Sequence, residues 1–290
     1  PAIYFDGLVQ KASLDNLLMC ALLAVLGAYV AGRRAGLLAV AGAVLGLFAL
    51  TRENALVFVV ILAAWLPFHL AGSSLKAKAT AIGLLAAGMA LVLVPVGLRN
   101  QAVGGDFLIT TSQAGSNFFI GNHQGATGRY LPLRPNHETY EFERLDAKEL
   151  AEQAAGHALT PGEVSSYWWR RSFAWIGAHP VDSLGLVGKK VLITWNRAEL
   201  PDSESLEIYA DHSPALKALS AVFGFGLLVA LAAPGMALSW RLSPRPVLLY
   251  LMLFGFSFAV AAFYVFARYR FPMVPILALF AGTTIAAVLD

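Results

Sequence analysis

The chain has 290 residues, of which 58% are hydrophobic and only 13% are charged, and its mean hydropathy is +0.64. A soluble domain carries roughly 25% charged residues, so this composition excludes an ordinary soluble enzyme, a disordered chain and a coiled coil. Of the 21 basic and 18 acidic residues, 25 lie between Arg99 and Lys217, which leaves long uncharged runs on either side. We therefore predict an all-α polytopic membrane protein.

The predicted membrane helices follow from those uncharged runs, because a helix needs about 20 apolar residues to cross ~30 Å of hydrocarbon. Four runs precede the polar segment and three follow it, which divides the chain into a membrane block at 1–98, a polar segment at 99–217 and a second membrane block at 218–290. The seven predicted spans are Asn16–Gly32, Ala35–Thr51, Ala55–Ala71, Ala79–Leu98, Ala218–Trp240, Pro246–Ala267 and Phe271–Leu289.

Basic residues in the short loops predict the orientation. Positive residues in short loops stay on the cytoplasmic side, and every second turn carries them. These residues are Arg33, Arg34, Lys76, Lys78, Arg241 and Arg245. The opposite, outer face then receives 1–15, the Arg52-Glu53 turn, the whole of 99–217 and 268–270. We expect a bacterial inner-membrane protein with residues 99–217 in the periplasm, and we attribute the net charge of +3 to lipid contact rather than nucleic acid.

The polar segment is patterned rather than a simple linker, and we predict a mixed structure. Residues 107–111 resemble a strand, 115–122 are rich in Gly and Asn, and 141–153 look helical. Thr160-Pro161-Gly162-Glu163 is a capping box that opens an aromatic helix ending near His179-Pro180, before another helix over 181–195.

Two interpretations stay open for these last two helices. The aromatic helix is suited to lying in the headgroup layer, or else offers an aromatic platform for a sugar ring or a lipid chain. Lys189 and Lys190 of the next helix could meet a lipid phosphate or simply extend to the polar interface.

Several kinds of site find no support in the residues. The six histidines are scattered, the single Cys20 lies in an apolar run, and no phosphate-loop or Gly-x-Ser-x-Gly spacing occurs. A solute transporter usually needs ionisable residues near the bilayer midplane, and the centres of the predicted spans carry none.

Arginines at the outer membrane boundary are the remaining chemical feature. Arg52-Glu53, Arg99-Asn100 and Arg268-Tyr269-Arg270 all fall at one predicted depth on one face. Each arginine alone is explained as an interface anchor. Together they suit a lipid-borne phosphate, because guanidinium groups bind phosphate oxygens through paired hydrogen bonds.

Short motifs in a fixed order add a family resemblance across nearly the whole chain. They are Leu50-Thr51-Arg52-Glu53, Pro95-Val96-Gly97-Leu98-Arg99-Asn100 with Gly104-Gly105, Gly115-Ser116-Asn117 with Gly121-Asn122, His179-Pro180, Lys189-Lys190, Trp195-Asn196, Glu199-Leu200-Pro201-Asp202, and Arg268-Tyr269-Arg270-Phe271-Pro272 with Pro275. With these motifs the chain resembles the integral-membrane GT-C glycosyltransferases of glycosyltransferase family 39. This is the dolichyl-phosphate-mannose-protein mannosyltransferase-like type, which includes bacterial aminoarabinose-transferase relatives.

The resemblance implies a GT-C-like fold and transfer of a sugar, with inversion, from a polyprenyl-phosphate donor to an acceptor on the outer face. Membrane lipids are the other expected partner, and a divalent cation could share the phosphate although no ligand set for it is visible. The implied site has Arg52, Arg99, Arg268 and Arg270 on the donor phosphate, with Asn100, Asn122 and Tyr269 shaping the sugar or acceptor pocket.

The chain also departs from the family pattern. The principal catalytic carboxylate of that family lies in the first outer loop, whereas this chain opens with Pro1–Gly7, which resembles a later outer re-entry. We therefore expect an N-terminally truncated fragment that is inactive alone, with Asp6 either a secondary acid or an ordinary loop residue. A lipid-carrier transporter or flippase, and a non-catalytic scaffold of a polysaccharide assembly complex, remain the alternatives.

Overall fold

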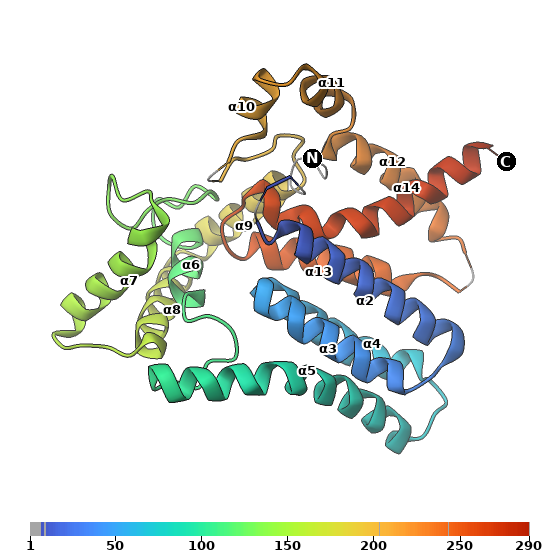
Figure 1. Ribbon diagram of the computed structural model, residues 1–290, viewed down its shortest axis with the longest axis horizontal. Coiled ribbons are helices and arrows are strands. Elements are labelled where there is room, and N and C mark those ends of the chain that lie inside the picture. The colour runs from blue at the N-terminus through green and yellow to red at the C-terminus, as the bar shows by residue number, and fades with distance from the viewer. Residues whose placement is uncertain (1–6, 9, 203, 243, 290) are drawn as a thin grey trace. The chain divides into compact units, whose positions relative to one another are not determined.

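The computed structural model describes residues 7, 8, 10–202, 204–242 and 244–289, and within them it is entirely helical, with no strand. The helices are labelled in Figure 1. They form two compact units. Unit 1 comprises Pro1–Ala90, Thr194–Phe258 and Phe266–Asp290, and unit 2 comprises Leu91–Ile193 and Ala259–Val265. Unit 2 therefore holds much of the polar segment together with a short stretch from the second membrane block.

The first half of unit 1 is built from consecutive apolar helices. These are α2 (Ala12–Gly32), α3 (Gly36–Thr51), the short 3-10 helix η1 (Glu53–Leu56), α4 (Val57–His69) and the beginning of α5 (Leu75–Gly104). Helices α3 and α5 approach very closely, because a Cβ atom at Gly42 would lie 2.0 Å from the Leu85 carbonyl oxygen and one at Gly88 would lie 1.9 Å from that of Ala39. Small residues permit such backbone contact in apolar surroundings.

The second half of unit 1 contains α10 (Leu206–Asp211), α11 (Pro214–Val222), α12 (Phe225–Ser239), most of α13 (Val247–Ala261), the 3-10 helix η2 (Ala267–Met273) and α14 (Val274–Leu289). Helices α12 and α14 also meet at a glycine, since a Cβ at Gly235 would lie 1.8 Å from the Phe280 carbonyl oxygen. In Figure 1, α14 runs beside both α12 and α2.

Five of the seven uncharged runs that predicted membrane spans are helical over nearly their whole length, whereas the run 218–240 is interrupted between α11 and α12 and the run 246–267 is helical only as far as Ala261. Four helices in the described part of the chain are long and apolar enough to cross a membrane, as in an integral membrane protein: Ala12–Gly32, Leu75–Gly104, Pro214–Ser239 and Ala267–Leu289. The shorter apolar helices are Gly36–Thr51, Glu53–His69 and Val247–Ala261. At 1.5 Å per residue, 16 residues cover about 24 Å, so the three short helices do not by themselves match a ~30 Å core.

Unit 2 contains the end of α5, then α6 (Ala114–Gly121), α7 (Tyr140–Ala155), α8 (Pro161–Ala178) and α9 (Pro180–Thr194). The predictions of α7, α8 and α9 are confirmed. The capping box is present: the Thr160 hydroxyl accepts from the Glu163 backbone N–H at 3.4 Å, and the Thr160 backbone N–H donates to Glu163 Oε2 at 2.8 Å.

One prediction for the polar segment is wrong. Residues 107–111 form no strand, because the Phe107 ring packs beside Gly97 of α5 and the Leu108 carbonyl accepts from Asn100 Nδ2 at 2.7 Å. The Gly- and Asn-rich stretch, for which the sequence predicted no element, forms helix α6, with Asn122 as its C-cap residue. Its Gly115 serves close packing, since a Cβ there would lie 2.0 Å from the Ser165 carbonyl oxygen of α8.

Candidate functional site

A buried ion pair joins the beginning of α2 to the end of α3 in unit 1. Asp15, in the first turn of α2, is completely buried, and Arg52, directly after α3, is 6% exposed. Arg52 Nε donates to Asp15 Oδ2 at 2.7 Å, and Arg52 Nη2 pairs with the same oxygen. Burying two charges is costly unless they are paired, so this contact fixes the direction of Arg52.

Two of the predicted arginines lie against one aromatic ring. The Arg52 guanidinium carbon is 5.0 Å from the centre of the Tyr269 ring, and that of Arg268 is 5.5 Å from it. Both distances suit attraction between a cation and the ring face. The structure thus brings Arg52 to Arg268 and Tyr269, which lie more than 200 residues further along the sequence.

A lysine that the sequence analysis missed belongs to the same neighbourhood. Lys11 is exposed as a residue and directly precedes α2, yet partial burial lowers the pKa of its ammonium group. Arg52 and Arg268 lower that pKa further, while Asp15 and Glu53 act in the opposite direction. Lys11 therefore brings a third cation toward the two arginines.

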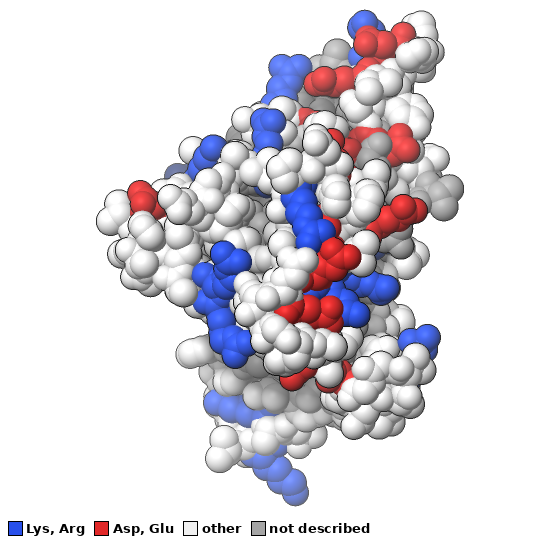
Figure 2. Space-filling view, turned by 90° about the vertical axis from the view of Figure 1, so that its left-hand side faces the viewer, with Lys and Arg blue, Asp and Glu red and all other residues white. Residues whose placement is uncertain are grey.

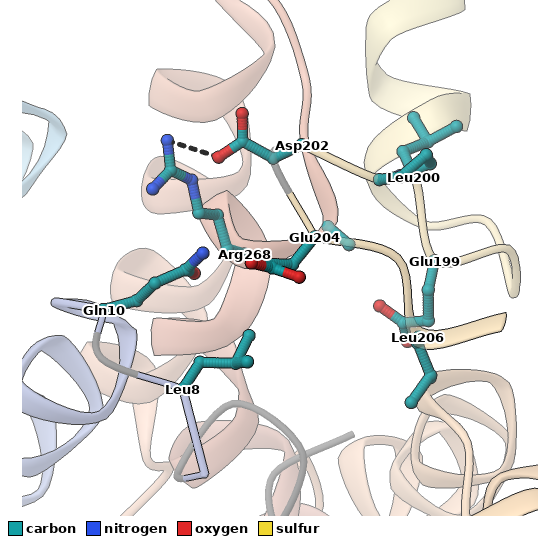
Figure 3. Close-up of a pocket in the computed structure, with 10 residues that line it drawn as sticks. Leu8, Gln10, Glu199, Leu200, Asp202, Glu204, Leu206 and Arg268 are labelled. Carbon is teal, nitrogen blue, oxygen red and sulfur yellow. Dashed lines mark ion pairs between the residues drawn. The ribbon is translucent and has the colours of Figure 1, made fainter. Parts of the chain in front are cut away.

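A cleft beside Arg268 is lined by apolar residues and by three acidic side chains (Figure 3). Arg268 Nη2 lies 2.6 Å from Asp202 Oδ2, and Glu199 and Glu204 also line the cleft. The cleft is narrow, with a cavity volume of about 20 Å³. In the view of Figure 3, Leu8, Gln10 and Arg268 stand on one side, and Glu199 and Leu206 on the other.

Arg270 is positioned quite differently from Arg268. It is 2% exposed, and its guanidinium donates to the carbonyl oxygens of Thr194 at 3.2 Å, of Asn196, and of Ala198 at 2.9 Å. It also pairs with Glu199 at 3.1 Å. Because these contacts use both of its terminal nitrogens, we assign Arg270 the role of holding the segment after α9 in place.

The other predicted site residues belong to unit 2. Arg99 Nη1 donates to Asn100 Oδ1 at 3.3 Å, and this contact is exposed. Asn122 is 4% exposed, and its Nδ2 donates to the carbonyl oxygens of Phe118 and Ala262, each at 2.8 Å. Asn122 is thus held within the packing of unit 2. Asp6 lies outside the described residues.

For Lys190, both interpretations left open in the sequence analysis are wrong. Its side chain is completely buried rather than extended to a lipid surface. Nζ donates to the carbonyl oxygen of Gly121 at 3.1 Å, to Asn122 Oδ1 at 2.9 Å and to the carbonyl oxygen of Ala262 at 3.4 Å. Burial lowers the pKa of Lys190 from 10.5 to about 8. Lys190 is therefore an internal connection between α9, the end of α6 and the 259–265 segment.

The described residues contain no group of three or more His, Cys, Asp or Glu side chains that could hold a metal ion. On the face shown in Figure 2, basic and acidic side chains are interleaved. Comparison of the chain with protein-family models, with curated proteins and with solved structures gives no match.

Proposed function

We propose that this chain is part of a membrane glycosyltransferase that transfers a sugar from a polyprenyl-phosphate donor to an acceptor on the outer face of a bacterial inner membrane. The observation that carries the proposal is the meeting of the Arg52 and Arg268 guanidinium groups at the Tyr269 ring, with Lys11 near enough for both arginines to lower its pKa. These residues stand at the beginning of α2, the end of α3 and the turn before α14.

Their placement suits a phosphate carried by a lipid. A polyprenyl tail cannot leave the bilayer, so its phosphate stays where apolar helices end. Guanidinium and ammonium groups stabilise the charge that develops on a departing phosphate, and they act more strongly where water is scarce. Asp15 holds Arg52 and Asp202 holds Arg268, so both guanidinium groups are oriented before a ligand arrives.

The acceptor hydroxyl must lose a proton as it attacks the sugar, and a carboxylate on the same face would take it. Glu204 lines the cleft beside Arg268 and accepts a hydrogen bond from the Tyr209 hydroxyl. We propose Glu204 as a candidate for this base in addition to Asp6, which is proposed from the sequence alone.

The test replaces the two arginines in the full-length protein. Arg52→Lys with Arg268→Gln should weaken binding of polyprenyl phosphate in nanodiscs by roughly a hundredfold, and transfer from polyprenyl-phosphate sugars should fall at least as far. Arg245→Gln is the matched control, because Arg245 lies in a different loop and contacts Trp240.

Unchanged binding in a double variant that remains folded would refute the phosphate site. Polyprenyl-phosphate binding with no sugar transfer from any donor would favour a lipid-carrier transporter. Absence of both activities in the wild-type protein would favour the scaffold.

A further inference from the structure

Helix α9 of unit 2 has an inside-out distribution of polar and apolar side chains. Its charged Lys190 is completely buried, as is Thr194. On the outside, Val181 is 81% exposed, and Leu184 and Leu192 are each 73% exposed. In water this arrangement would be unfavourable twice over, because large apolar side chains would be exposed and a charged group would be buried.

The exposed apolar residues share a single face of the helix. At 3.6 residues per turn, positions 181, 184, 188 and 192 follow one stripe, and Lys190 lies about two and a half turns from Val181, on the opposite side. Gly188, which is also exposed, completes the stripe without adding a polar side chain. Asp182 and Lys189 are exposed on one flank of this stripe.

We infer that the face formed by Val181, Leu184, Gly188 and Leu192 lies in the bilayer, at the boundary between headgroups and acyl chains. The same chain carries four helices long and apolar enough to span a membrane, so we expect unit 2 to be close to a bilayer. Helix α9 has 15 residues and covers about 22 Å, too short for a ~30 Å core, which leaves an orientation along the surface.

The charged flank fits the same placement. Helices in this boundary layer bury their apolar face about 5–10 Å deep and keep charged groups at headgroup level. Lys189 can meet a lipid phosphate there, whereas Lys190 is already occupied by three protein acceptors. This inference concerns a lipid contact of unit 2 and holds whatever reaction unit 1 supports.

Cysteine labelling of the full-length protein tests it directly. The printed chain has one cysteine, so a Cys20→Ser background accepts single labels at Leu184→Cys and Leu192→Cys, with Asp182→Cys as the matched control on the polar flank. Each carries an environment-sensitive fluorophore in nanodiscs of phosphatidylethanolamine and phosphatidylglycerol containing nitroxide-labelled lipids.

We expect blue-shifted emission from labels at 184 and 192. Lipids that carry the nitroxide near the chain carbonyl should quench these two labels roughly twofold more strongly than the label at 182. At 184 and 192 they should also quench more strongly than lipids that carry the nitroxide near the chain end. Red-shifted emission at 184 and 192, with quenching by aqueous iodide, would overturn the inference in favour of a solvent-facing helix. Lipid-independent emission together with cross-linking between two Leu184→Cys chains would overturn it in favour of a second copy.

Discussion

Asp15 and Arg52 show how one residue pair can fix a predicted ligand-binding side chain. Asp15→Asn leaves the nearly buried Arg52 guanidinium without a counter-charge, so we expect a loss of roughly 3 kcal/mol in the free energy of unfolding. Thermal unfolding in detergent measures it.

The double variant Asp15→Asn with Arg52→Gln provides the control, because it removes both charges. It should be more stable than Asp15→Asn alone, and a strictly additive loss would show that the pair is not coupled.

The burial of Lys190 predicts how the free energy of unfolding changes with pH. Because burial holds its folded-state pKa at about 8, below the 10.5 of an exposed lysine, the unfolded chain binds more protons between these two pH values. Stability should therefore rise as pH increases from about 8 toward 10.5, by at most about 3 kcal/mol. Unfolding measured across this pH range checks it.

Lys190→Met should remove this part of the slope, and Lys189→Met should leave it intact, since Lys189 is exposed on the same helix. Equal slopes in both variants would contradict the assignment to Lys190.

At the scale of elements, the packing of α3 against α5 depends on two glycines. Gly42→Ala would place a Cβ 2.0 Å from the Leu85 carbonyl oxygen, a backbone atom that cannot turn aside. We expect a loss of about 1–3 kcal/mol in stability, measured by thermal unfolding.

Gly83→Ala is the matched control on α5, because its Cβ would meet nothing within 4 Å. That variant should be neutral or gain up to about 1 kcal/mol from helix propensity. A destabilisation equal to that of Gly42→Ala would mean that close packing is not the cause.

Helices were predictable from the sequence where local signals agree. The Thr160 capping box identifies α8 and the uncharged runs identify the apolar helices, since both signals lie within the sequence of the helix itself. The strand predicted for residues 107–111 is wrong because β-branched and aromatic residues favour a strand only when a second strand is present to pair with. The surface position predicted for Lys190 is wrong because the direction of its side chain depends on partners 68–72 residues away in the sequence.

At the scale of the whole molecule, charge distribution alone separated apolar from polar sequence. It could not show which arginines meet. Arg52, Arg268 and Tyr269 come together through the packing of α2, α3 and η2, whereas Arg99 and Asn122 belong to unit 2. Long-range proximity of this kind has no local signature, so Lys11, despite lying beside a predicted arginine in space, was not a candidate.

The two glycine contacts between α3 and α5 constrain motion as well as stability. Gly42 against Leu85 and Gly88 against Ala39 are two points of backbone contact about one turn apart, and together they set both the register and the rotation of the helices. Neither helix can slide or turn alone without a collision. We therefore expect α3, which ends directly before Arg52, to follow any displacement of α5 between Leu75 and Ala90.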